Sequence, residues 1–357
     1  MRSYFRMKLN TLNSNCPDVT RTDNGRVKFV DVAKCITIMI VVIYHLNKCN
    51  SVFANAFFMP VFFFLSGIFF KPFVSIHAFI KRESRGLLLP CAVGVLAGLA
   101  TEVLFYHFQD VSFREGLHLK YLTFYLVGNV PLWFLIALFW MQTIVYIVEN
   151  GFKRLSFRMM AYTILAVIGY MCSIMHWRNT GFFGNACLGL PFFLVGYYGK
   201  EYWLSGRWYS HLLLVVSILT LLLVVPLDVR NNFHHTIVSP YYFPTIIFAF
   251  AGIYLIMGIS LLLTQRFKCS FMMWIGESTL YVLIFHYLFV PQIRDHWWSQ
   301  VIPEGMYLTK VSAVATALLL ACITILMGKL LQRVAPFMFP PQQGRRRIAT
   351  VAKPSAL

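Results

Sequence analysis

Long apolar runs, separated by short polar or basic segments, follow one another along almost the whole chain. A helix that crosses the roughly 30 Å hydrocarbon core of a bilayer needs about 20 such residues, and about 17 is the lower limit. Several runs lie near that limit, and no internal repeat relates them. The pattern predicts ten membrane-spanning helices, at about residues 32–50, 53–70, 87–107, 131–149, 160–176, 184–199, 209–227, 241–263, 271–291 and 307–330.

The composition supports an integral membrane protein. Of the 357 residues, 59% are hydrophobic and 12% are charged, whereas soluble domains carry about 25% charged residues. We therefore predict an all-α, polytopic membrane fold. It consists of a basic N-terminal segment (1–31), one membrane domain (32–331) and a basic tail (332–357). Residues 1–28 are polar and lack an apolar core, so no cleavable signal peptide is expected.

The basic residues predict the orientation of the chain. With the N-terminus inside, 24 of the 31 Lys and Arg residues fall on the cytoplasmic side of the ten spans and 7 on the other side. Cytoplasmic loops are enriched in these residues, so both termini are expected in the cytoplasm. This bias, together with attraction to anionic lipid, explains the net charge of +18. The lipid bilayer is therefore an expected partner, and nucleic acid is not.

The first predicted span carries the most informative polar residues. Asp31 and Lys34 stand at its start, and His45 lies deep in the apolar run that follows. Ionisable residues inside a membrane span are costly and mark candidate functional sites. Lys34 and His45 are eleven residues apart, which is about three helical turns, so they share a face roughly 16 Å apart. The simpler interpretation is an anchoring cation and a buried histidine that only makes a hydrogen bond.

Two more ionisable residues are predicted at the depth of His45. Counted from the cytoplasmic side, Glu102 and His286 each lie about fifteen residues into their spans, roughly 21–23 Å from the surface. A neutral imidazole at this depth could act as a general base towards a hydroxyl, oriented by a carboxylate. The alternatives are an interfacial glutamate and a histidine that only bonds a neighbouring helix.

A basic segment precedes the third span. Lys81, Arg82 and Arg85 fall within the stretch FIKRESRGLLLP. Residues three apart are neighbours on a helix, so the two arginines form a compact site suited to phosphate groups. Ordinary positive-inside anchoring explains the same residues. Both interpretations remain open from this segment alone.

No metal site and no disulfide framework are predicted. The predicted external loop 228–240 contains a pair of histidines, His234 and His235, but no carboxylate or third ligand is nearby in the sequence. The cysteines show no CxxC pair and mostly lie in apolar runs, where cysteine behaves as a small hydrophobe. The eight are Cys16, Cys35, Cys49, Cys91, Cys172, Cys187, Cys269 and Cys322.

Together these segments resemble the membrane acyltransferase-3 family of sugar O-acetyltransferases, in the right order and over most of the chain. In that family an Arg or Lys precedes a catalytic histidine by the interval found between Lys34 and His45. Two departures stand out: Lys34 replaces the arginine of many members, and Glu277 stands where a small or amide residue is usual. The matching segments are DVAK with His45, Met59–Gly67, Arg82 to Pro90, Pro131–Leu135 and Ser278–His286.

The resemblance implies an enzyme of the cell inner membrane. It would move acetyl from cytoplasmic acetyl-CoA to a hydroxyl of a cell-surface polysaccharide or lipid-linked sugar. His45 would be the general base or a transient acyl carrier, oriented by His286 or Glu102. The donor would be held by cations at the cytoplasmic end, and the acceptor would arrive from outside past Trp133. The donor-site candidates are Lys34, Arg82 and Arg85, with Asp31 beside them.

Two other functions are weighed against this one. An exporter or transporter would use the buried ionisable groups as a proton relay, although the sequence shows no inverted repeat and no paired broken helices. A non-catalytic scaffold would leave three ionisable groups at one depth unexplained. Dependence on acetyl-CoA separates the enzyme from the exporter. Neither the acceptor sugar nor the choice between acetyl and another acyl group, such as succinyl, follows from the sequence.

Overall fold

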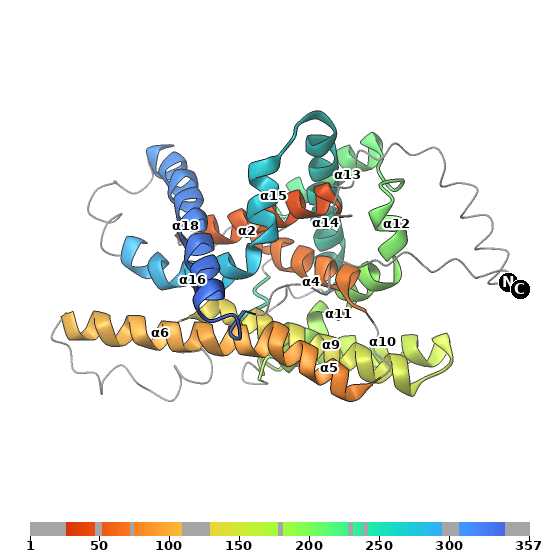
Figure 1. Ribbon diagram of the computed structural model, residues 1–357. Helices are drawn as coiled ribbons and strands as arrows, with labels where there is room; N and C mark the ends of the chain where they lie inside the picture. Colours follow the sequence, from red (N-terminus) through yellow and green to blue (C-terminus); the bar gives the residue numbers. More distant parts are fainter. Residues whose placement is uncertain are drawn as a thin grey trace, which may run out of the picture.

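A computed structural model shows a bundle of helices, with no β-strand among the residues that it describes (Figure 1). The described residues are 26–46, 52–71, 75–108, 129–177, 181–227, 231–236, 238, 242–294 and 307–339. The predicted all-α fold is therefore confirmed. The helices are α2 (Lys28–Leu46), α3 (Val52–Asn55), α4 (Phe58–Phe69), α5 (Ile76–Glu83), the π-helix η2 (Ser84–Leu88), α6 (Leu89–Phe108), the 3-10 helix η3 (Val130–Leu132), α9 (Trp133–Gly151), α10 (Leu155–Ile174), α11 (Phe183–Tyr198), α12 (Lys200–Leu204), α13 (His211–Leu222), α14 (Tyr242–Arg266), α15 (Ser270–Glu277), α16 (Thr279–Gln292) and α18 (Tyr307–Val334).

The helices agree with a polytopic membrane protein. Within the described ranges, six helices are long and apolar enough to cross a membrane, and a seventh span results if α15 and α16 are counted together. Three shorter apolar helices lie at the positions of the remaining predicted spans. The number of ten and the cytoplasmic termini remain predictions. The three shorter helices are Phe53–Phe69, Phe183–Tyr198 and His211–Leu222.

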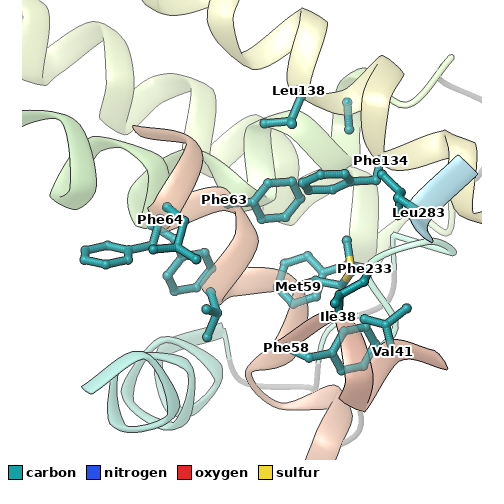
Figure 2. Close-up of a cluster of buried hydrophobic side chains, with 14 of the residues drawn as sticks. Ile38, Val41, Phe58, Met59, Phe63, Phe64, Phe134, Leu138, Phe233 and Leu283 are labelled. Atoms are coloured by element: carbon teal, nitrogen blue, oxygen red, sulfur yellow. The ribbon is translucent and has the colours of Figure 1, made fainter. Parts of the chain in front are cut away.

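Helix α2 lies at the centre of the bundle. Helices α4, α14, α15, α16 and α18 all pack against it, and most of its residues are buried. Its apolar side chains meet those of α4, α9 and α16 in one aromatic-rich cluster (Figure 2). Phe233, from the segment between α13 and α14, lies in the same cluster. A helix surrounded in this way holds any polar group that it carries at a fixed depth.

The ninth predicted span is broken in two. Helices α15 and α16 meet at Ser278 with a bend of 78°. Helix α15 packs closely against the start of α2, and at Gly276 a Cβ atom would overlap the carbonyl oxygen of Asp31. Only a glycine permits this approach of the two backbones. The bend then directs α16 towards the far end of α2.

The first prediction concerns orientation in the membrane. Trp177, after α10, and Tyr202, on α12, are both exposed, and the ten-span arrangement places them on opposite sides. In a cysteine-free background, we expect Trp177→Cys to react with an impermeant maleimide from outside and Tyr202→Cys only after the membrane is permeabilised. Labelling of both positions from the same side would contradict the ten-span arrangement.

The second prediction tests the close approach of α15 and α2. We expect Gly276→Ala to lower the stability of the protein by about 1–3 kcal/mol, because an added methyl group forces two packed backbones apart. Thermal unfolding in detergent measures this as a lower melting temperature. Gly151→Ala is the matched control, since a Cβ there meets nothing within 4 Å. An equal melting temperature for both variants would contradict the contact.

Candidate active site

Two of the sequence-predicted histidines meet at the end of α2. His45 lies in the last turn of α2, and His286 lies in the middle of α16. The Nδ1 atom of His45 lies 3.0 Å from the Nε2 atom of His286. The two rings are nearly parallel, with an interplanar angle of 13° and centroids 5.3 Å apart. Residues 241 positions apart in the chain therefore form one hydrogen-bonded pair.

The backbone determines the direction of this hydrogen bond. The Nδ1 atom of His286 lies 2.7 Å from the carbonyl oxygen of Val282. A carbonyl oxygen only accepts, so the Nδ1–H of His286 is the donor. In a neutral ring, the Nε2 atom of His286 is then an acceptor, and His45 must donate its own Nδ1–H to it. The Nε2 atom of His45 is left with a lone pair, which is the state that a general base or a nucleophile requires.

The two histidines differ in how accessible they are. His286 is fully buried, whereas His45 is partly exposed. The ring of Tyr287 stands edge-on to His45 at a centroid distance of 5.1 Å, and that of Tyr44 does so at 5.5 Å. Rings on two sides restrict rotation of the imidazole. His45 is therefore the more accessible of the two imidazoles.

The third residue predicted at this depth is only partly placed. Glu102 lies on α6, but its side chain is outside the described residues. Helix α6 packs against α16, so the helix of Glu102 contacts the helix of His286. Whether its carboxylate meets the histidine pair stays a prediction. Of the two residues expected to orient His45, His286 is the one whose hydrogen bond to it the structure shows.

Sequence analysis missed Asn129, which ties two of these helices together. Its side-chain amide donates hydrogen bonds to the carbonyl oxygens of Gly94 on α6 (3.0 Å) and Ile284 on α16 (2.9 Å). Asn129 is fully buried, and Ile284 lies two residues before His286. Buried amides of this kind hold helices in register. The available signal was a polar residue directly before the start of an apolar helix.

A second polar cluster lies at the cytoplasmic end of α2 in the predicted orientation. The carboxylate of Asp31 is 3.3 Å from the Nζ atom of Lys34 and 3.1 Å from Arg26. Arg26 also reaches Glu277, at the end of α15, at 2.7 Å. The ammonium of Lys34 lies 4.5 Å from the centre of the Phe69 ring. Within the part of the chain that the structure describes, these two cations and two carboxylates form one ionic network. Arg26 and Glu277 were not predicted to take part in it.

The two halves of this network differ in strength. The side chains of Asp31 and Lys34 are only 6% and 11% exposed, whereas those of Arg26 and Glu277 are 32% and 43% exposed. Removing one partner of a buried ion pair costs about 3–5 kcal/mol, but an exposed pair contributes only about 0–1 kcal/mol. The buried pair of Asp31 and Lys34 is thus costly to separate, whereas the exposed pair of Arg26 and Glu277 can be separated at little cost in free energy.

The other predicted donor-site residues lie on a different helix. Arg82 is on α5 and Arg85 is in the π-helix η2; both are exposed. The π-helix η2 packs against α6 and α9, and α5 packs against η2. Arg85 therefore lies in a π-turn and not in the regular α-turn that the sequence spacing assumed. Arg82 lies 3.5 Å from the buried carboxylate of Glu83, which sequence analysis also missed. The structure therefore leaves the assignment of Arg82 and Arg85 to a donor site as a prediction.

The pair His234 and His235 lies in a segment that packs into the bundle. Asn185 on α11 donates hydrogen bonds to the carbonyl oxygens of Phe233 and His234. The ring of His234 lies 5.8 Å from that of Trp133. Among the described residues, no three His, Cys, Asp or Glu side chains are arranged to hold a metal ion. The external position of this loop stays a prediction; Phe233 within it is buried.

Comparison with known proteins adds one finding. The model of the acyltransferase-3 family, described as an acyltransferase domain, matches residues 27–327. The matched range includes both histidines and, of the ionic cluster, Asp31, Lys34 and Glu277; Arg26 lies one residue before it. No curated protein and no solved structure matches the chain.

Proposed function

The chain belongs to the acyltransferase-3 family, and from this premise we propose that it is an O-acetyltransferase of the cell inner membrane. It is a multi-pass membrane acyltransferase by family and fold. In our proposal the donor is cytoplasmic acetyl-CoA, and the acceptor is a hydroxyl of a cell-surface polysaccharide or lipid-linked sugar. The observation that carries the proposal is the hydrogen bond between His45 and His286, because it leaves a lone pair on the accessible ring.

The lone pair of His45 supports two routes of acyl transfer. In the direct route, Nε2 removes the proton of the acceptor hydroxyl while its oxygen attacks the thioester carbonyl carbon. The carbon–sulfur bond breaks, and the leaving thiolate takes the proton back from the imidazolium. In the covalent route, Nε2 attacks the thioester carbonyl carbon first, and the carbon–sulfur bond breaks to release the CoA thiolate. The acceptor hydroxyl then attacks the acetyl carbon, the carbon–nitrogen bond to His45 breaks, and the hydroxyl proton passes to the thiolate. In both routes His286 accepts a hydrogen bond from Nδ1–H and stabilises the positive charge that develops on His45.

The proposed donor path runs along α2. Lys34 and His45 lie about 16 Å apart along this helix, a distance that an extended pantetheine arm is suited to bridge. The phosphates of the donor would then lie at the cytoplasmic end of the bundle, where Arg82 and Arg85 offer exposed guanidinium groups. Guanidinium groups bind phosphate through two parallel hydrogen bonds. Lys34 is paired with Asp31, so its part in donor binding would be mainly electrostatic.

The third prediction tests the histidine pair. We expect His45→Ala and His45→Gln to reduce the rate of acetyl transfer by about 10²–10⁴-fold, since neither side chain takes up a proton. We expect His286→Ala to lower kcat by a smaller factor, on the order of 10-fold, because His45 then loses the acceptor that selects its tautomer. Acetyl-CoA turnover in nanodiscs and the mass of the surface glycan measure both effects.

His211→Gln is the matched control for these variants. His211 lies at the start of α13, is exposed, and forms a hydrogen bond through its Nδ1 atom with the hydroxyl group of Tyr209. We expect its activity to equal that of the wild type. A His45→Gln variant that acetylates glycan at a near wild-type rate would show that His45 is neither base nor acyl carrier.

The fourth prediction tests the cytoplasmic cations. We expect the double change Arg82→Ala with Arg85→Ala to raise the KM for acetyl-CoA while folded protein remains in the membrane. Lys34→Arg should keep much of the activity, because the positive charge is retained. Arg154→Ala is the control, since Arg154 is an exposed cation before α10 on the same predicted side. An unchanged KM in the double variant would remove Arg82 and Arg85 from the donor site.

A further inference from the structure

The outer half of the ionic network presents a guanidinium group at the cytoplasmic end of α2. Arg26 stands just before α2, and its two terminal nitrogens contact different carboxylates: Nη2 contacts Asp31 and Nη1 contacts Glu277. Lys34 contacts the other oxygen of Asp31. Arg26 and Lys34 therefore flank a single buried carboxylate, and their positive charges lie on the same side of the bundle.

The carboxylate of Glu277 is the exchangeable member of this network. It is 43% exposed, whereas that of Asp31 is 6% exposed. A guanidinium group pairs with the oxygen atoms of either a carboxylate or a phosphate, so one can replace the other. A phosphate that replaces Glu277 loses little, because the exposed pair is weak and water solvates the released carboxylate. Replacement of Asp31 would instead leave a buried charge without its partner.

We propose that Arg26 binds a phosphate group of the acyl-CoA donor and that Glu277 occupies this place when the donor is absent. The inference rests on the proposed function and adds to it a binding residue and a competing carboxylate. Glu277 keeps Arg26 oriented and its charge neutralised until a donor enters. The same competition weakens donor binding, because each donor molecule must displace the carboxylate.

A purely structural role for the same ion pair makes a different prediction. If Arg26 and Glu277 only fasten the segment before α2 to α15, then removing either charge should lower thermal stability equally and leave donor binding unaltered. If Glu277 competes with the donor, then removing its charge strengthens donor binding, and removing Arg26 weakens it. The two variants then move the KM in opposite directions.

The experiment is a double-mutant cycle on the full-length protein in nanodiscs of neutral lipid, titrated with acetyl-CoA. We expect Glu277→Gln to lower the KM for acetyl-CoA by about three- to fivefold, the factor that corresponds to one exposed ion pair. We expect Arg26→Gln to raise the KM, and the gain from Glu277→Gln to disappear when Arg26 is also changed. Glu201→Gln removes an exposed acid of α12 on the same predicted side and should leave the KM at its wild-type value.

Each outcome decides the matter. A Glu277→Gln variant with an unchanged or higher KM overturns the inference, as does a gain that persists without Arg26. If Arg26→Gln fails to fold, Arg26→Lys gives the same comparison, because lysine keeps the positive charge but lacks the paired donors of the guanidinium group.

Lipid phosphates are a second source of the same anion, so the titration is repeated in anionic nanodiscs. A KM effect of Glu277→Gln that appears only there would assign Arg26 to lipid headgroups and overturn the inference. A wild-type protein that neither binds nor uses acetyl-CoA overturns the proposed function itself.

Discussion

The hydrogen bond between His45 and His286 is the contact on which the account of this protein depends. It joins the end of α2 to the middle of α16, and the carbonyl oxygen of Val282 determines its direction. Two features of the fold make the contact possible. Helix α2 is enclosed by five other helices, which hold His45 at one depth. The 78° bend after α15 turns α16 towards the far end of α2, although α15 itself packs at the near end.

The polar groups at the two ends of α2 are stabilised by different contacts. At one end, two imidazoles share a hydrogen bond, and one of them retains an accessible lone pair. At the other end, four charged side chains compensate one another, with the buried pair of Asp31 and Lys34 inside and the exposed pair outside. In the proposed function, the charged end receives the anionic donor and the imidazole end carries out the transfer. The same helix carries both.

Much of this arrangement could be predicted from the sequence, because apolar runs of about 20 residues and isolated ionisable residues are strong local signals. The all-α fold follows from such signals, and the family follows from the resemblance of several segments in the right order. For His45 and His286, the sequence predicted only a similar depth in the membrane. Their hydrogen bond depends on the bend between α15 and α16. The π-turn at Arg85, the ion pair of Arg26 with Glu277 and the burial of Phe233 depend on contacts between distant segments. No local pattern encodes them, and Glu277 stood out only as a departure from the family.

The protonation state of His45 is the most direct test of the central claim. Solid-state ¹⁵N NMR of the protein in lipid distinguishes a protonated ring nitrogen from an unprotonated one, and the signals absent from a His45→Gln sample identify those of His45. The account predicts that these signals come from a neutral ring with a proton on Nδ1 and a lone pair on Nε2. A proton on Nε2, with the lone pair on Nδ1, would contradict it, because the nitrogen that does not contact His286 would then have no lone pair to offer as base or nucleophile.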